Sequence, residues 1–332
     1  MSANPSTSFR TRKILLSGVK PTGRPHIGNY FGAMKQFADL EDGYDCLFMI
    51  ADYHALNFIQ NREEMHDNIF DLTLDYLAIG LDPKTSIIFR QSDVSAHTEL
   101  AWIFDTITTM PYLMRAHAFK DAEAKDKEIS VGTFNYPMLM AADILLYDTD
   151  VVPVGQDQKQ HVEYARDTAQ KFNRIFGPRQ GGASETFKLP EPLILERVST
   201  VLGTDGRKMS KSYGNTIPLF ATDEEIEKAV MSIVTDSSGE RPENVYAIHT
   251  LLLEKNDLDT LYTENKGQYK KLKEALVEDL KKFIGPMRER RQALEKDKTA
   301  VFEVLEAGGK VARKRAEKKM EEVREKVGLK LS

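Results

Sequence analysis

The sequence has a single cysteine, Cys46, among its 332 residues. One cysteine excludes a disulfide within the chain, and it excludes zinc or iron–sulfur sites built from several cysteines. A protein without disulfides suits a reducing compartment, most simply the cytoplasm.

Long apolar runs are also missing. No stretch approaches the roughly 18 uncharged apolar residues of a membrane span, and the densest run, residues 46–51, has the length of a strand. Residues 1–12 are rich in Ser, Thr and Arg and lack the apolar stretch of a secretory signal. We expect a disordered polar tail there, with a short transit peptide as the alternative, and no association with a membrane.

The chain lacks a net positive charge, since its formal net charge is −5, which by itself argues against a nucleic-acid binder. The charges are unevenly distributed, however. Residues 265–332 hold 20 Lys and Arg against 12 Asp and Glu, a charge of +8, which leaves −13 for residues 1–264. A basic tail favours a polyanionic partner, and solvated amphipathic helices explain it equally well.

The first two thirds of the chain alternate short apolar runs with segments of helical period. This alternation predicts an α/β fold, a doubly wound parallel sheet with helices on both faces. The expected strands are residues 14–16, 46–51, 86–89 and 151–154, and the expected helices are residues 29–40, 62–79 and 97–115. Two breaks, at residues 115–132 and 177–206, are expected to be irregular.

After Thr222 the pattern becomes helical. Residues 223–225 have the acidic character of a capped helix start. Apolar residues recur every three or four positions and are expected to be core positions. They are Leu272, Leu276 and Leu280 in one segment and Ala312, Ala316 and Met320 in another. We therefore divide the chain into the tail (1–12), an α/β domain (13–219) and an α-helical domain (220–332).

A Gly- and Pro-rich turn, residues 21–29, follows the first expected strand and opens a helix. Helix starts attract phosphate because their N–H groups are unpaired. Gly18, Gly23 and Gly28 allow close approach of a ligand, and His26 and Asn29 are candidate donors to phosphate oxygens. Taken alone, this turn has an equally good structural interpretation.

A second motif, residues 203–212, carries Lys208 and Lys211 in a loop flanked by glycines. Two lysines three positions apart can reach one polyphosphate. A surface lysine pair is usually only solvated. We interpret this pair as a phosphate-binding site because the first motif occurs in the same α/β domain.

Together, His26-Ile27-Gly28-Asn29 and Lys208-Met209-Ser210-Lys211-Ser212 resemble the two signatures of class I aminoacyl-tRNA synthetases. Residues 135–147 (NYPMLMAADILLY) and 152–161 (VPVGQDQKQH) closely resemble bacterial-type tryptophanyl-tRNA synthetases. The resemblance covers about residues 12–328. It implies a Rossmann-like catalytic domain with an inserted segment at 13–219 and a tRNA- and anticodon-binding helical domain at 220–332.

The resemblance also implies a reaction. L-Tryptophan is ligated to tRNA(Trp) at the expense of ATP with Mg²⁺, through a tryptophanyl-adenylate, with release of AMP and pyrophosphate. The family further implies a cytoplasmic homodimer. The first step needs no nucleophilic side chain, because the carboxylate of the amino acid is already ionised; it needs alignment and neutralisation of the charge that accumulates on pyrophosphate.

Site residues follow position by position from the resemblance, and no metal-binding side chains are expected. Asp143 is expected to accept the indole N–H, although without the resemblance a helix cap or an ion pair would be the preferred interpretation. The catalytic set is Lys208, Lys211, His26 and Asn29. The ATP-binding set is Lys20, Thr22, Gly23, His26, Gly28, Asn29, Gly155, Asp157, Lys208, Met209, Ser210 and Lys211. The tryptophan-binding set is Leu16, Gly18, Tyr136, Met140, Asp143 and Gln158.

Three positions depart from the family pattern. Asn29 replaces the last His of the first signature, and Lys20 replaces the Gln of many bacterial relatives. Ala122 stands where relatives have a second lysine, so Lys120 or Lys125 has to supply that charge.

Three alternatives remain. A tyrosyl-tRNA synthetase usually has a tyrosine on the first strand, where this chain has Leu16 and Gly18. A small-molecule nucleotidyltransferase needs no basic helical tail. A regulatory paralogue that binds tRNA or an amino acid has no need for both lysines and the His-Ile-Gly-Asn turn.

Overall fold

The computed structural model describes residues 12–116, 119–120, 123, 128–155, 159–177, 185–194, 200–235 and 241–331. Within these ranges, five strands form one parallel sheet in the order β3-β2-β1-β4-β5. They are β1 (Ile14–Val19), β2 (Asp45–Ile50), β3 (Ile87–Arg90), β4 (Val151–Val154) and β5 (Glu191–Ile194). The strand order reverses at β1 and β4, and ligands of such sheets bind outside the carboxyl ends of the strands at this point.

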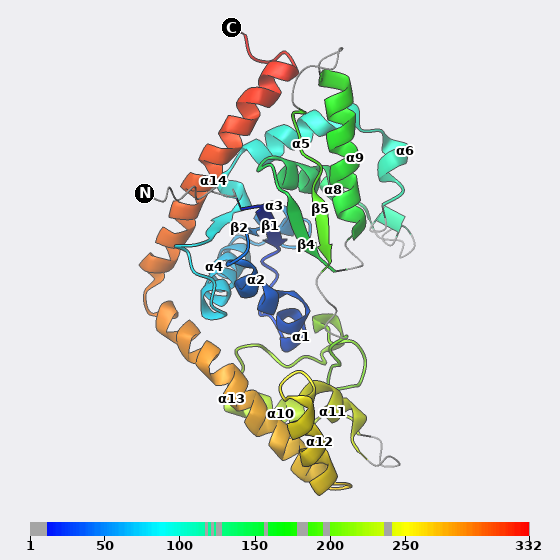
Figure 1. Ribbon diagram of the computed structural model, residues 1–332, viewed down its shortest axis with the longest axis vertical. Helices are drawn as coiled ribbons and strands as arrows, with labels where there is room; N and C mark the ends of the chain where they lie inside the picture. Colours follow the sequence, from blue (N-terminus) through cyan, green and yellow to red (C-terminus); the bar gives the residue numbers. More distant parts are fainter. Residues whose placement is uncertain are drawn as a thin grey trace, which may run out of the picture.

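Helices cover both faces of the sheet, because successive residues of the buried strands enter opposite cores. Phe48 joins one core and Leu47 the other. The first face is covered by α2 (Lys35–Leu40) and α4 (Arg62–Ala78), and the second by α5 (Ala96–Ile107), α8 (Val131–Leu145) and α9 (Lys159–Phe176). The predicted doubly wound α/β fold is confirmed (Figure 1).

Two details of the sequence-based prediction were wrong. Strand β5 lies inside the segment that was expected to be irregular. Its proline, Pro192, argued against a strand in the sequence, but proline is tolerated there because β5 is an edge strand. The helix expected over residues 97–115 is two helices, α5 and α6 (Met110–Leu113). The backbone becomes extended at Thr108, with φ −102° and ψ 141°, and Pro111 cannot supply the N–H that would continue α5.

The chain after residue 222 is helical, as predicted. Thr222 caps the first of these helices in a reciprocal pair with Glu225. The helices are α10 (Asp223–Met231), α11 (Glu243–His249), α12 (Lys255–Glu264), α13 (Tyr269–Glu295) and α14 (Lys298–Lys326). None of the helices in the described ranges is long and apolar enough to cross a membrane.

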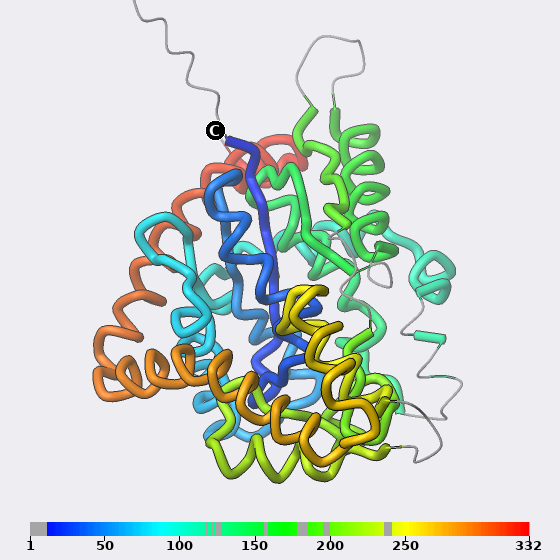
Figure 2. Tube along the Cα trace, turned by 60° about the horizontal axis from the view of Figure 1, so that its bottom comes forward, coloured from blue at the N-terminus to red at the C-terminus, as the bar shows by residue number. Residues whose placement is uncertain are grey.

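The last helix returns to the sheet. Figures 1 and 2 show α14 running from the end of α13 up along the side of the α/β layers. A β-carbon added at Gly308 would lie 1.9 Å from the carbonyl oxygen of Ile88, so the α14 backbone rests directly on β3. Ala312, Ala316 and Met320 join the core of the second face. The predicted stripe is therefore a core stripe, and it belongs to the sheet rather than to a separate helical unit.

Candidate functional site

The first motif forms the turn between β1 and α1 (Ile27–Asn29). His26 precedes the helix, and its backbone N–H donates to Oδ1 of Asn29 at 3.1 Å. The backbone N–H of Ile27 donates to the carbonyl of Ile217 at 3.0 Å, and that of Leu219 donates to Pro25 at 3.0 Å. The turn is thus fixed to the segment that follows the second motif.

The two motifs also meet directly. The ammonium of Lys211 donates to the carbonyl oxygens of Thr22 and Gly23 at 2.9 and 3.0 Å. A β-carbon at Gly28 would lie 2.8 Å from Nδ1 of His26 and 3.3 Å from Cβ of Met209. The structure therefore brings together residues that lie about 180 positions apart in the sequence.

Burial shapes the electrostatics of this contact. His26 is buried, and desolvation together with the charge of Lys211 lowers its pKa to about 4, so the ring is neutral at pH 7. Its Nδ1 atom is buried without a hydrogen-bond partner among the described residues. Burial lowers the pKa of Lys211 as well. An unpaired imidazole nitrogen beside a partly desolvated ammonium suits a phosphate oxygen.

Lys20 lies at the same end of β1. Burial lowers its pKa, and its ammonium sits 4.5 Å from the centre of the Phe58 ring. Lys20 therefore adds a further cation at the end of β1.

The loop of the second motif is held by Asn215, a residue that the sequence analysis missed. The Asn215 carboxamide oxygen accepts the Ser210 N–H at 2.8 Å, and its nitrogen donates to Oδ1 of Asp205 at 2.6 Å and to the Lys208 carbonyl at 3.2 Å. A β-carbon at Gly203 would lie 2.3 Å from this carboxamide. The Lys208 side chain itself is exposed. The only signal for Asn215 in the sequence is that it directly follows a glycine, Gly214. In the structure this glycine has a positive φ of 64°.

Asp143, on α8, lies at the centre of a buried polar network. Its Oδ2 atom is 2.9 Å from Nε2 of His54, which belongs to α3 (Asp52–Ala55). Its Oδ1 atom is 2.6 Å from Nδ1 of His97 and accepts from Nε2 of Gln91 at 2.8 Å. His97 in turn contacts the Tyr147 hydroxyl at 2.9 Å. Asp143 therefore has two buried histidine partners, in partial agreement with its interpretation as a member of an ion pair.

This network occupies most of the hydrogen-bond acceptor positions of the Asp143 carboxylate and leaves few for a ligand. Burial alone raises the pKa of Asp143, but the charges and hydrogen bonds of His97 and His54 outweigh it and hold the pKa at about 2. Each carboxylate oxygen has two acceptor positions. Two nitrogens already face Oδ1 and one faces Oδ2. One acceptor position on Oδ2 is therefore available to a further N–H.

Tyr136 lies beside this network. Its ring meets the His54 ring edge-on, with centroids 6.2 Å apart, and its hydroxyl is 3.4 Å from Nε2 of His161. Met140 is half-buried on the same helix, one turn before Asp143. The predicted side chains of α8 therefore share one face of the site.

The remaining predicted residues are placed as follows. Leu16 is buried in the core of the second face, whereas Gly18 is exposed and a β-carbon there would lie 3.1 Å from Cε of Met49. Gly155 is exposed directly after β4. Lys120 is exposed. Asp157, Gln158, Ala122 and Lys125 lie outside the described residues.

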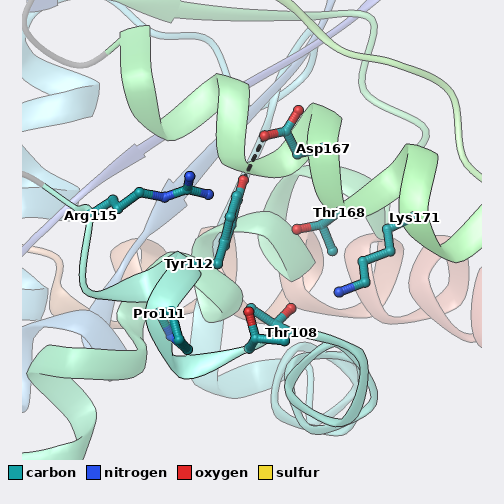
Figure 3. A pocket seen from close by; sticks show the side chains of 8 residues that line it. Thr108, Pro111, Tyr112, Arg115, Asp167, Thr168 and Lys171 are labelled. Atoms are coloured by element: carbon teal, nitrogen blue, oxygen red, sulfur yellow. Dashed lines mark hydrogen bonds between the residues drawn. The ribbon is translucent and has the colours of Figure 1, made fainter.

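Two cavities lie near these elements. A cavity of about 750 Å³ is lined by Tyr136, Asn135 and Asp105 together with the exposed Trp102. Another, of about 260 Å³, lies between α6 and α9, and Figure 3 shows its Tyr112 pointing toward Asp167, to which the hydroxyl donates at 2.7 Å. Only the larger cavity includes a predicted site residue.

Several basic residues of the C-terminal segment, residues 265–332, form ion pairs within the molecule. Arg291 pairs with Asp71 and Asp75, Arg315 with Asp45, Lys319 with Asp148, and Arg324 with Glu99. These four basic residues thus pair with acidic residues of the front part of the chain. Uneven charge is therefore weaker evidence for a polyanionic partner than the sequence indicated.

The described ranges contain no group of three or more His, Cys, Asp or Glu side chains arranged to hold a metal ion.

Comparison with known proteins identifies the family. A family model described as tRNA synthetases class I (W and Y) matches residues 9–323. The tryptophan–tRNA ligase of Fusobacterium nucleatum is 48% identical over 325 residues, which span 96% of this chain and 98% of the relative. That of Rhodopirellula baltica is 42% identical over 324 residues, covering 95% and 99%.

A solved structure agrees. The tryptophanyl-tRNA synthetase of Campylobacter jejuni, complexed with ADP and tryptophan, superposes with a TM-score of 0.87 at 40% identity and covers 95% of this chain and 99% of that one. The chain therefore belongs to the class I tRNA synthetases of the tryptophan and tyrosine group.

Proposed function

We propose that this protein is a tryptophan–tRNA ligase, which joins L-tryptophan to tRNA(Trp) with ATP through a tryptophanyl-adenylate. The observation that carries the chemistry is the contact between the two motifs, in which Lys211 is hydrogen-bonded to Thr22 and Gly23 beside the unpaired Nδ1 of His26. The names of the relatives support the choice of amino acid.

In the first step the tryptophan carboxylate attacks the α-phosphorus of ATP, and the bond to the β-phosphate oxygen breaks. The products are tryptophanyl-adenylate and pyrophosphate, and no proton has to be removed. Lys208 and Lys211 neutralise the charge that develops on pyrophosphate, and His26 donates a hydrogen bond to a phosphate oxygen as a neutral ring. Mg²⁺ bound to the phosphates would supply further neutralisation of their charge.

In the second step the terminal ribose hydroxyl of tRNA takes the acyl group, and AMP leaves. We assign amino-acid selection to Asp143, whose Oδ2 has one acceptor position left for the indole N–H. A substrate without this N–H leaves a buried acceptor unpaired, at a cost of about 1–3 kcal/mol. Tyr136 and Gln158 are assigned to the ammonium and carboxylate of tryptophan, and Gly155 and Asp157 to the adenosine.

The tRNA is assigned to the helical domain, residues 220–332, and the ATP and tryptophan sites to the catalytic domain, residues 13–219. We place the enzyme in the cytoplasm because a chain with one cysteine suits a reducing compartment.

We also propose a homodimer. Trp102 and Leu56 are 71% and 52% exposed and line the cavity of about 750 Å³, so an apolar surface is available there to a second copy. Trp102 is the only tryptophan of the chain and reports on this surface directly. Its fluorescence should shift to longer wavelength on dilution at the concentration where sedimentation shows dissociation; a monomer at all concentrations would contradict the dimer.

Pyrophosphate exchange with ATP and each amino acid in turn tests the proposal. Exchange with tryptophan alone is expected. Exchange with tyrosine would indicate the tyrosine enzyme, exchange without any amino acid would indicate a nucleotidyltransferase, and binding of tryptophan or tRNA without exchange would indicate a regulatory protein.

A further inference from the structure

Lys20 directly follows β1, at the carboxyl end of the sheet where the strand order reverses. Its carbonyl oxygen accepts the Thr22 N–H at 2.9 Å, and the Thr22 carbonyl in turn accepts the Lys211 ammonium at 2.9 Å. Lys20 is exposed, so a ligand in the site can reach its side chain. Lys20 therefore belongs to the same turn that holds Lys211.

The ammonium of Lys20 rests on an aromatic ring. It lies 4.5 Å from the centre of the Phe58 ring, within the range of a cation–π contact. Burial lowers the pKa of Lys20, and among the residues that the structure describes no carboxylate acts against this effect. The Lys211 ammonium likewise donates to uncharged groups, the carbonyl oxygens of Thr22 and Gly23. Contacts of this kind fix an ammonium without cancelling its formal charge, which stays available to an anionic ligand.

Phe58 is a large apolar side chain that is 68% exposed. Its neighbour Ile59 is 6% exposed and anchors the segment in the interior. The backbone N–H groups of Phe58 and Ile59 both donate to the Ala55 carbonyl, at 2.8 and 2.9 Å. The segment is therefore fixed without the Phe58 ring, and the ring itself covers the Lys20 ammonium.

The segment that carries Phe58 is attached at two points of the site. The Ala51 N–H donates to the carbonyl of Val19, the last residue of β1, at 2.9 Å. Three residues later His54, in α3, contacts Asp143 at 2.9 Å. Phe58 therefore has a fixed position relative to the end of β1, and its ring can serve as a rigid support for a flexible side chain.

We propose that Phe58 is a positioning residue for ATP: its ring holds the Lys20 ammonium, still charged, at the carboxyl end of β1, where the ammonium meets a phosphate oxygen. A lysine side chain is long and flexible, and a contact that restricts it before the ligand binds reduces the entropy lost on binding. A ring does this without adding a negative charge that would compete with the phosphate. The inference rests on the proposed function only in taking the anion to be a phosphate of ATP.

A double-mutant cycle tests this role, with the affinities for ATP and for tryptophan measured separately by calorimetry. Phe58→Leu keeps an apolar side chain but removes the ring face. It is expected to weaken ATP binding about fivefold, as the loss of a cation–π contact of ordinary strength would, and to leave tryptophan binding unchanged. Lys20→Met is expected to weaken ATP binding at least as much.

The double variant and the conservative variant distinguish positioning from support of the fold. Adding Phe58→Leu to Lys20→Met is expected to cause no further loss of ATP affinity, because the ring then has no ammonium to hold. Phe58→Tyr is expected to bind ATP normally, because it retains the ring face. A further loss in the double variant, equal to the loss in Phe58→Leu alone, would show a structural role and would overturn the inference.

The matched control is Phe302→Leu, which makes the same change at another exposed phenylalanine. Phe302 is 39% exposed and lies on α14, with its ring centre 5.4 Å from that of Phe70. This variant is expected to leave ATP affinity unchanged even where it lowers the melting temperature. An equal loss of ATP affinity in Phe302→Leu and Phe58→Leu would overturn the inference.

Three further outcomes would also overturn it. Tighter ATP binding in Phe58→Leu would mean that the ring draws Lys20 away from the phosphates. Unchanged ATP binding in Lys20→Met would remove Lys20 from the phosphate site, and a loss of tryptophan affinity in place of ATP affinity would assign the ammonium to the amino acid.

If Phe58→Leu does not fold, Phe58→Met takes its place in the cycle with the same expected results. Failure of the proposed function appears separately, as the absence of tryptophan-dependent pyrophosphate exchange in the unchanged protein, while the ATP-binding cycle is still measured.

Discussion

His26 can hold its ring position only because residue 28 is glycine, since a β-carbon at Gly28 would lie 2.8 Å from Nδ1 of His26. This is closer than a β-carbon can approach without moving the ring. The glycine of the first signature thus keeps the imidazole in place.

Gly28→Ala should therefore lower kcat/KM for ATP in pyrophosphate exchange by roughly tenfold or more, because a small misplacement of an aligning group is costly. The control is Gly32→Ala, one turn later in the same helical segment, where a β-carbon meets nothing within 4 Å. Equal losses in both variants would show that the helix, rather than the His26 contact, is sensitive.

Asp143→Ala should raise KM for tryptophan at least about tenfold and weaken discrimination against phenylalanine, because the acceptor for the indole N–H is lost. The melting temperature should fall too, since His54 and His97 lose their partner. Steady-state kinetics on the folded fraction separates these effects.

Tyr147→Phe is the control for that variant. It removes the hydroxyl that contacts His97 and leaves Asp143 in place. It should lower the melting temperature with little change in KM for tryptophan. An unchanged KM in Asp143→Ala would assign the residue to the fold alone.

The sequence predicted four strands, the helix starting at residue 223 and the two signature motifs, because these depend on local periodicity and on short stretches of sequence. It did not predict that Lys211 contacts the turn of the first motif, since the two lie far apart in the chain. It did not predict the partners of Asp143. His54 and His97 come from two other helices and approach only through tertiary folding. Nothing in the apolar segment around Asp143 indicates them.

The packing of α14 against the sheet could not be predicted from the sequence pattern either. Helical spacing marks Ala312 and Ala316 as buried but does not say against what. Truncation of the chain after about Thr222 would remove this helix as well, and with it part of the core of the second face. Truncation is therefore expected to unfold the catalytic part, and point variants are the better experiment.

Lys208→Ala and Lys211→Ala should each lower the rate of adenylate formation roughly a hundredfold while tryptophan affinity changes little. Their charges matter most where charge develops on pyrophosphate, in the transition state. Single-turnover rates and tryptophan binding are the measurements. Parallel losses in both would mean that the loop supports the fold instead.

Gly308→Ala should destabilise the protein by about 2 kcal/mol or more, because its methyl group would overlap the carbonyl oxygen of Ile88 and push α14 off β3. Gly285→Ala in α13 is the matched control. Apart from its chain neighbours and its own helix backbone, no heavy atom lies within 4 Å of a β-carbon there. Pro286 follows and disfavours helical backbone in a preceding alanine, which offsets the helix propensity gained, so the change should be smaller than about 1 kcal/mol. Urea denaturation measures both; destabilisation of equal size would contradict the direct contact of α14 with the sheet.

The tRNA surface is best tested away from the ion pairs that hold α14. Three consecutive basic residues, Arg313, Lys314 and Arg315, lie on α14. Arg313 donates to the Asp93 carbonyl, and Arg315 pairs with Asp45 at 2.8 Å. Reversal of either would report on folding. Lys314 lies between them in the chain and is exposed.

Lys314→Glu should leave the melting temperature unchanged. If Lys314 contacts a phosphate of the tRNA, its reversal reduces the dependence of log affinity on log salt by roughly 0.7–0.9 for that contact, because one fewer counterion is released. Arg315→Glu should lower the melting temperature instead, since it sets two carboxylates against each other. Filter binding across a salt series decides the question. An unchanged slope for Lys314→Glu would mean that the exposed charge of α14 is only solvated, and it would move the proposed tRNA contacts to α10–α13.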